Sequence, residues 1–266
     1  MKRTNLSAAL ATVMLLAACG SSKVASTTLP ATTAAPTTVA AAVPTTSTVP
    51  AVSRIVSLSP TATEMLFAIG AGGQVLAVDD QSNYPPEALQ KPHDLSGYQP
   101  NVEAIAALKP DAVLIGDDSS GLSKQLDALG LKTWVGAAAT SFDGVYQQIE
   151  QLGALTGHVA EAAALVLKMQ TEIAAAVKDA PKPATPLTYY HELDNTYYSV
   201  TENTFIGQVY ALFGLQSIAD LQEVSSDYPQ LSAEAIISAN PDFIFLADGN
   251  RDAVRYRRRW PGAGNR

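Results

Sequence analysis

Cysteine and histidine are scarce in this chain, and their scarcity excludes several kinds of site. The 266 residues include one cysteine, Cys19, so no disulfide can form within the chain. The three histidines, His93, His158 and His191, are too few and too dispersed to predict a metal cluster. Glu192 follows His191, but the second histidine of a zinc-binding H-E-x-x-H helix is missing. We therefore expect no metal site and no cofactor.

The signatures of common catalytic sites are missing as well. The sequence has no G-x-S-x-G nucleophile turn and no G-x-x-x-x-G-K-S/T phosphate loop. The sequence therefore predicts no catalytic residue and favours binding over catalysis. An enzyme is the third-ranked interpretation. It would gain support from a catalytic activity that the substitution His191→Ala abolished.

The sequence also has few positively charged residues and no long apolar runs. Seventeen Lys and Arg residues stand against 25 Asp and Glu residues, which gives a formal net charge of −8. A negative protein repels phosphates, so nucleic acid is not an expected partner. No apolar run reaches the roughly 18 residues that a membrane-spanning helix requires. We therefore predict a protein that is not integral to the membrane.

The N-terminus has the pattern of an export signal. Lys2 and Arg3 precede an apolar stretch, residues 6–18, and the run LAAC that ends at Cys19 matches the lipobox of bacterial lipoproteins. We predict a signal peptide over residues 1–18 and lipidation of Cys19, which would anchor an extracytoplasmic protein to the cell membrane by acyl chains. The alternative is an ordinary secretory signal with an unrelated cysteine.

A low-complexity segment separates this signal from the rest of the chain. Residues 24–50 carry no charge and consist of Ala, Thr, Val, Pro and Ser with one Leu. Such a composition offers little apolar surface to pack, and frequent prolines favour an extended chain. We therefore predict that residues 19–52 form a disordered tether behind the lipidated cysteine.

From residue 53 onward, strand and helix patterns alternate. The predicted strands are residues 54–58, 75–78, 111–115, 132–135, 187–191, 197–200 and 242–246. The predicted helices are residues 60–69, 102–108, 119–129, 141–156, 204–213 and 232–239. This alternation is typical of mostly parallel sheets with helices on both faces.

Residues 158–180 form a longer pattern of helical period with no internal Gly or Pro. It is either a crossover helix within one sheet or a connection between two lobes, and we favour the second because a new strand–helix series follows. An internal repeat supports two lobes: VEAIAALKPDAVLI at 102–115 and AEAIISANPDFIFL at 233–246 share Glu-Ala-Ile and Pro-Asp. The predicted fold is α/β, with two Rossmann-like lobes (residues 53–157 and 181–247) joined by this helix.

Three segments carry a resemblance to a known class. Residues 54–70, RIVSLSPTATEMLFAIG, together with SNYPPEA around Tyr84 and SGYQ around Tyr98, resemble solute-binding proteins of ABC importers whose lobes are joined by a long helix. That class includes cobalamin, ferric-siderophore and haem carriers. The resemblance implies a monomer that binds cobalamin first, or a ferric siderophore or haem, and delivers it to a permease and its ATPase.

The resemblance also implies roles for two glutamates. Glu64, expected in the first helical turn, and Glu202, at the start of a helix in the second lobe, would pair with arginines of the permease. The alternative for both is favourable placement in the dipole of a helix. Two other functions stay open: a tethered ligand sensor, and a non-functional truncated product.

Eight residues are the candidate ligand contacts, because they follow the carboxyl ends of predicted strands, where open α/β sheets bind ligands. They are Ser59, Asp80, Tyr84, Tyr98, Asp117, Asp118, His191 and Glu192. Aromatic rings suit a corrin, a porphyrin or an aromatic siderophore. The alternative for each tyrosine is a turn residue that packs its own loop.

The last residues, 248–266, differ from everything before them. They hold six of the eight arginines and carry a charge of +4. They form either a basic arm for an acidic surface or membrane phosphates, or an aberrant tail translated in a shifted reading frame. We favour the second, because members of the class continue here with further strand–helix units, so we expect an incomplete second lobe.

Overall fold

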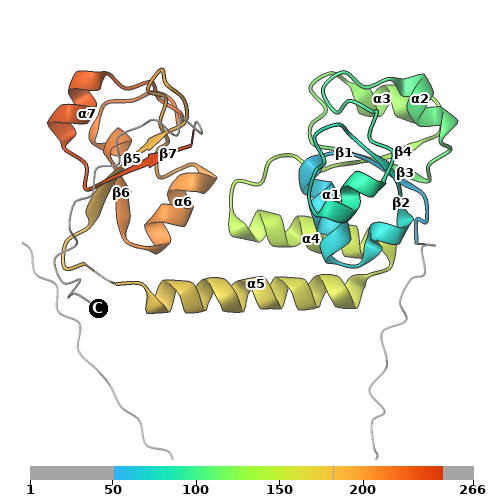
Figure 1. Cartoon of the computed structure of the whole chain (residues 1–266), viewed down its shortest axis with the longest axis horizontal. Coiled ribbons are helices and arrows are strands. Elements are labelled where there is room, and N and C mark those ends of the chain that lie inside the picture. Colours follow the sequence, from blue (N-terminus) through green and yellow to red (C-terminus); the bar gives the residue numbers. More distant parts are fainter. Residues whose placement is uncertain (1–50, 182, 248–266) are drawn as a thin grey trace, which may run out of the picture. The chain divides into compact units, whose positions relative to one another are not determined.

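The computed structural model describes residues 51–181 and 183–247, which form two parallel sheets with helices (Figure 1). The predicted signal peptide, Cys19, most of the tether and the segment 248–266 lie outside the described residues. Within the described ranges, no helix is both long enough and apolar enough to span a bilayer. The predicted fold class, two parallel α/β lobes joined by a long helix, is confirmed.

The first sheet has four parallel strands in the order β2-β1-β3-β4. Its strands are β1 (Ile55–Leu58), β2 (Val75–Val78), β3 (Ala112–Ile115) and β4 (Lys132–Val135). Helices α1 (Pro60–Ala68), α2 (Val102–Ala107) and α3 (Leu122–Asp127) lie between these strands in the chain, and α4 (Phe142–Thr156) and α5 (Val159–Asp179) follow β4.

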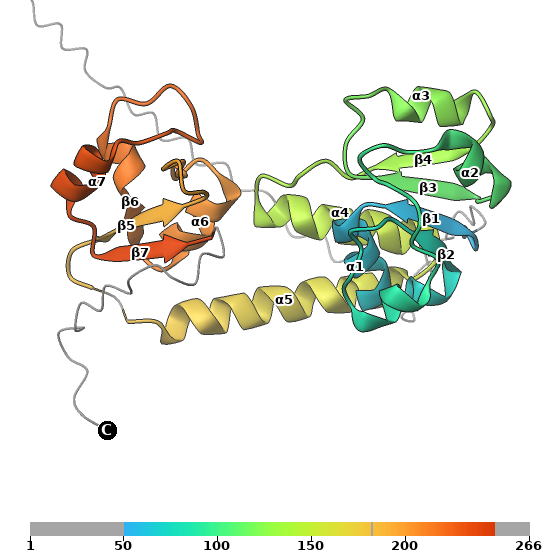
Figure 2. The same ribbon diagram turned by 45° about the horizontal axis from the view of Figure 1, so that its top comes forward.

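Apolar side chains on both faces of this sheet explain why helices cover both. Alternate residues of a strand point to opposite faces. Ile55 joins a core cluster with residues of α1, α4 and α5, whereas Val56 and Leu58 join a second cluster with residues of α2 and α3. Figure 2 shows the sheet between these two groups of helices. All four residues of β1 and of β3 are buried, as expected for central parallel strands.

Local signals define α1, the helix that follows β1. The hydroxyl of Ser59 accepts a hydrogen bond from the N–H of Ala62 at 3.3 Å, and Pro60 occupies the first turn. Gly70 follows the C-cap residue with φ of +84°, a conformation that glycine adopts without strain. The predicted placement of Glu64 in the first turn was wrong: that turn holds no acidic residue, and Glu64 lies in the next turn, where it is exposed.

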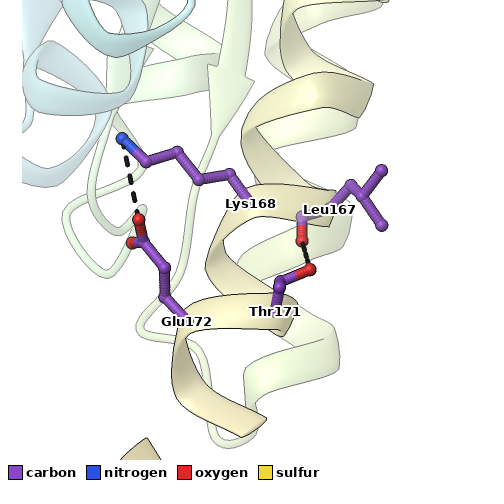
Figure 3. Close-up of polar contacts among 4 residues, drawn as sticks. All are labelled: Leu167, Lys168, Thr171 and Glu172. Atoms are coloured by element: carbon purple, nitrogen blue, oxygen red, sulfur yellow. Dashed lines mark hydrogen bonds and ion pairs between the residues drawn. The ribbon is translucent and has the colours of Figure 1, made fainter. Parts of the chain in front are cut away.

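Helix α5 is long but only partly buried. Its first half packs on α4 through Ala162 and Val166, which are its two buried residues. Further along, Lys168 lies 3.9 Å from Glu172, and the hydroxyl of Thr171 donates to the carbonyl of Leu167 at 2.7 Å (Figure 3). The ion pair is exposed and contributes little. The second half of α5 is Ala-rich, and its helical conformation is therefore stabilised largely by intrinsic helix propensity.

The second sheet has three parallel strands in the order β6-β5-β7. They are β5 (Leu187–Glu192), β6 (Leu215–Ser217) and β7 (Phe243–Leu246), accompanied by α6 (Phe205–Leu212) and α7 (Ala233–Ala239). On one face, the Tyr210 ring of α6 packs against Tyr189 and Phe245 at centroid distances of 4.3 and 4.7 Å. On the other face, Tyr190 packs with Ile218, Leu231 and α7.

The sequence repeat corresponds to a repeated structural unit. After both α2 and α7, the residue directly before Pro-Asp has a positive φ: Lys109 at +50° and Asn240 at +44°. In each unit the aspartate accepts a backbone N–H bond at the start of the neighbouring strand: Asp111 from Arg54, directly before β1, at 3.0 Å, and Asp242 from Thr188 of β5 at 3.0 Å. The same kind of helix–strand junction therefore occurs in each of the two sheets.

Three local predictions differ from the structure. Residues 197–200 form no strand, because Tyr197 has φ of +69° and only a bridge between Tyr198 and Gln230 follows. Helix α3 starts three residues later than predicted, after Gly121 in the left-handed region, because the preceding aspartates hold a turn. The three-residue strand β6 was not predicted.

Candidate ligand-binding site

A pocket of about 470 Å³ opens at the carboxyl ends of β1, β3 and β4. This is the edge of a parallel sheet where ligands bind, because loops rather than helices cover it. The lining comes from the turn that starts α1, the loop before α2, and the segments after β3 and β4. Its residues are Leu58–Thr61, Gly97, Tyr98, Ile115–Asp117, Ser119, Ser120, Leu122 and Gly136–Ala138.

Three of the predicted contacts line this pocket: Ser59, Tyr98 and Asp117. Ser59 is buried, and its hydroxyl caps α1. The Tyr98 side chain is 92% exposed, so its ring makes few contacts with its own loop and is accessible to a ligand. Asp117 accepts the N–H and hydroxyl of Ser119 at 2.9 and 2.6 Å, which lowers the pKa of its carboxyl. The pocket therefore combines an exposed ring with one anionic group.

Three further candidates lie near the same sheet edge but do not line the pocket. Asp118 accepts the N–H of Ser123 at 2.8 Å and the Ser123 hydroxyl, which lowers its pKa and holds the turn into α3. Asp80 and Tyr84 are exposed on the loop after β2. Asp118 thus holds the turn into α3, and the side chains of Asp80 and Tyr84 are accessible to a partner.

The last two candidates belong to the second sheet. His191 and Glu192 end β5, and neither lines the pocket at the first sheet. His191 is 8% exposed, and burial lowers its pKa. Its Nδ1 lies 2.9 Å from the Tyr210 hydroxyl, while its Nε2 is buried without a hydrogen-bond partner. Glu192 is half-buried.

Sequence reasoning missed several residues of these sites. Tyr210 lies in the predicted helix 204–213 and has no sequence signal of its own, because its contact with His191 joins positions 19 residues apart. Ser119 and Ser120 line the pocket, and their position directly after the strand that ends in Gly-Asp-Asp was the available signal. Gly97 had no signal of its own beyond its neighbour Tyr98.

Both candidate docking glutamates are exposed. Glu202 precedes Thr204, the N-cap of α6, by two residues. The N–H of Glu202 donates to the carboxylate of Asp220 at 2.9 Å, which fixes the backbone of this loop. Within residues 51–181 and 183–247, no group of three or more His, Cys, Asp or Glu side chains is arranged to hold a metal ion.

Two parallel α/β units, a long helix between them in the chain and a pocket at the strand ends define the class of two-lobed solute-binding proteins. Residues 55–258 match the periplasmic binding protein family, and the chain belongs to that family. The fold and the relatives are those of binding proteins for transport rather than enzymes, as the sequence predicted.

Two relatives illustrate the similarity in sequence. A cobalamin-binding protein of Halobacterium salinarum is 36% identical over 197 residues, which are 72% of this chain and 53% of that protein. The substrate-binding lipoprotein YvrC of Bacillus subtilis, an uncharacterised ABC transporter component, is 31% identical over 78% of this chain and 68% of its own length. The chain spans about half the length of the Halobacterium relatives that it matches.

Solved structures show the same fold. The vitamin B12 binding protein BtuF of Vibrio cholerae superposes with a TM-score of 0.60 at 26% identity, covering 73% of this chain and 76% of BtuF. A possible iron-binding solute-binding protein of Staphylococcus epidermidis gives a TM-score of 0.67 at 24% identity, over 74% of this chain and 78% of that one.

Proposed function

We propose that this chain is a solute-binding lipoprotein that captures cobalamin, or a ferric siderophore or haem, and delivers it to the permease of an ABC importer. The observation that supports it best is the pocket of about 470 Å³ at the strand ends, with the Tyr98 ring exposed beside it. A conjugated macrocycle offers a broad apolar face to such a ring. Amide or hydroxyl groups at its edge match Asp117, Ser59 and Ser119.

Cobalamin stands first among these ligands because the relatives named for a ligand include cobalamin-binding and vitamin B12-binding proteins. Haem is the next candidate, since the chain also shares its fold with haem-binding proteins. We propose that Asp80, Tyr84, Asp118, His191 and Glu192 supply further contacts to the ligand. The mechanism is reversible binding, in which no covalent bond is made or broken.

Delivery requires attachment and docking. Lipidation at Cys19 would keep the protein at the outer face of the cell membrane, and residues 19–52 would let the folded part reach a membrane partner. The exposed carboxylates of Glu64 and Glu202 would pair with arginines of the permease, for which a planar guanidinium is well suited.

Thermal unfolding of the mature protein with cyanocobalamin, haem and a ferric siderophore in turn tests the cargo. A ligand that binds the native state alone at 100 times its Kd adds about 2.7 kcal/mol of stability and raises the Tm. Tyr98→Ala should abolish that rise without lowering the Tm of the free protein, because the side chain is 92% exposed. Tyr228→Ala, at an exposed tyrosine that does not line the pocket, is the control. A clean transition that none of the three ligands moves would refute the proposed cargo.

A further inference from the structure

One wall of the pocket carries almost no side chains. Gly136, Ala137 and Ala138 follow β4 and line the pocket, and both alanines are exposed. No side chain of these three residues is larger than a methyl group. The position of the backbone therefore sets how far this wall, residues 136–138, extends into the pocket.

The loop that carries Tyr98 lies at the other end of the pocket. A Cβ on Gly97 would lie 2.8 Å from the carbonyl oxygen of Leu58, so this loop packs over the end of β1. The strand order β2-β1-β3-β4 places β4 two strands away from β1. Neighbouring strands are about 4.8 Å apart, so roughly 10 Å separates the strand ends that carry the loop and the wall. A longer side chain on the wall would therefore narrow the pocket.

Two glutamines of α4 hold the chain on either side of Gly136. Gln148 and Gln151 are three positions apart, so they lie on the same face of the helix. The side-chain amide of Gln148 donates to the carbonyl of Ala137 at 2.6 Å. The indole N–H of Trp134 donates to Oε1 of Gln151 at 3.1 Å. Helix α4 thus fixes both the strand end before the wall and the wall itself.

The first residue of the wall is held from two further sides. A Cβ on Gly136 would overlap with the ring of Trp134, so this ring packs directly against the glycine backbone. The N–H of Gly136 donates to the carbonyl of Ile115 at 2.9 Å, which joins the wall to the end of β3. The bond from Gln148 lies one residue further along the wall, at Ala137. It therefore holds the part of the wall that carries the exposed methyl groups.

We propose that residues 136–138 are the wall that sets the size of the ligand, and that Gln148 is the positioning residue that holds this wall. The methyl groups of Ala137 and Ala138 leave room for a bulky ligand such as cobalamin. The bond from Gln148 to the carbonyl of Ala137 keeps the wall from moving when the ligand binds. This inference rests on the proposed function, because it takes the pocket as the ligand site.

Ala138→Leu tests the effect of the wall on ligand size. The longer side chain would fill part of the pocket, so the affinity for cyanocobalamin should fall about tenfold, as expected for overpacking, and less for dicyanocobinamide, the smaller corrin without the nucleotide. The Tm of the free protein should not change, because Ala138 is exposed. Ala154→Leu, at an exposed position of α4 outside the pocket lining, is the control. Unchanged affinity for cyanocobalamin, or an equal fall for both corrins, would overturn the size role.

Gln148→Ala tests the positioning role, with Gln147→Ala, at the exposed neighbouring glutamine of α4, as the control. A wall that is no longer held can move away from a longer side chain. Ala138→Leu should therefore lower the affinity for cyanocobalamin by about threefold in the Gln148→Ala background, rather than tenfold. Without ligand, hydrogen exchange at the amide of Gly136 should be faster in Gln148→Ala than in Gln147→Ala. Additive effects on affinity, or equal exchange in the two variants, would overturn the positioning role.

The wild-type protein distinguishes failure of this inference from failure of the proposed function. A wild type that binds cyanocobalamin while Ala138→Leu binds it equally well would refute the size role alone. A wild type that does not bind cyanocobalamin would refute cobalamin as the cargo, and the size role with it. Hydrogen exchange at Gly136 requires no ligand, so it decides the role of Gln148 in either case.

Discussion

Replacing Gly97 by alanine tests how rigidly the Tyr98 loop is held. The new Cβ would lie 2.6 Å from Asp79 Oδ2 and 2.8 Å from the carbonyl oxygen of Leu58. Close C···O contacts in proteins lie at about 3.3–3.6 Å, so the loop must move by roughly 0.5–1 Å. Neither obstacle can give way, because one is strand backbone and the other is a buried side chain.

Overpacking of this kind costs about 1–3 kcal/mol. For a domain of this size, that lowers the Tm by roughly 3–10 °C. Because Tyr98 follows directly, the affinity for the ligand should fall as well. Urea denaturation and ligand titration of Gly97→Ala measure the two effects.

Gly73→Ala is the matched control, because a Cβ there meets no atom within 4 Å and the residue has no positive φ. Its stability should stay within about 0.5 kcal/mol of the wild type or rise slightly, since alanine restricts the unfolded chain. If Gly97→Ala behaved like Gly73→Ala in both assays, the loop would not be held against Asp79, and the reasoning would fail. A loss of stability with unchanged affinity would mean that the packing of the loop stabilises the fold but does not position Tyr98 for the ligand.

Three further predictions follow from burial and charge. Leu152→Ala, at a fully buried core position, should cost about 2–5 kcal/mol in chemical denaturation, whereas Leu167→Ala, at a side chain 65% exposed, should change stability by less than about 0.5 kcal/mol. Burial lowers the pKa of His191, so the folded state resists the proton that the unfolded state takes up below pH 6.5; stability should fall there as pH decreases, and His191→Gln should remove that part of the loss. Replacing Glu64 and Glu202 by lysine should leave the Tm and ligand affinity unchanged but abolish stimulation of the importer's ATPase in proteoliposomes; unaltered stimulation would rule out docking through these carboxylates.

Much of the fold could be predicted because its signals are local. Ser59, Asn101, Ser141, Thr204 and Ser232 each precede a helix, and each side chain accepts an N–H bond from the first turn. Such caps depend on residues three positions apart. The strand–helix alternation and the repeated Pro-Asp unit likewise follow from short segments. The sequence could therefore specify the elements and two α/β lobes.

The partners of individual side chains depend on distant segments, so the sequence left them open. Asp79 and Asp80 are adjacent, and the sequence favoured Asp80 as a ligand contact. Consecutive residues at the end of a strand point to opposite sides, so the structure buries Asp79 against Ser82 and Gly97 and leaves Asp80 exposed. Nothing in the sequence distinguishes the two carboxylates. The sequence by itself determined a binding fold with polar residues at its strand ends, and only tertiary packing decided which of them line the pocket and which acid is buried beside it, because burial is set by segments that meet only in the folded chain.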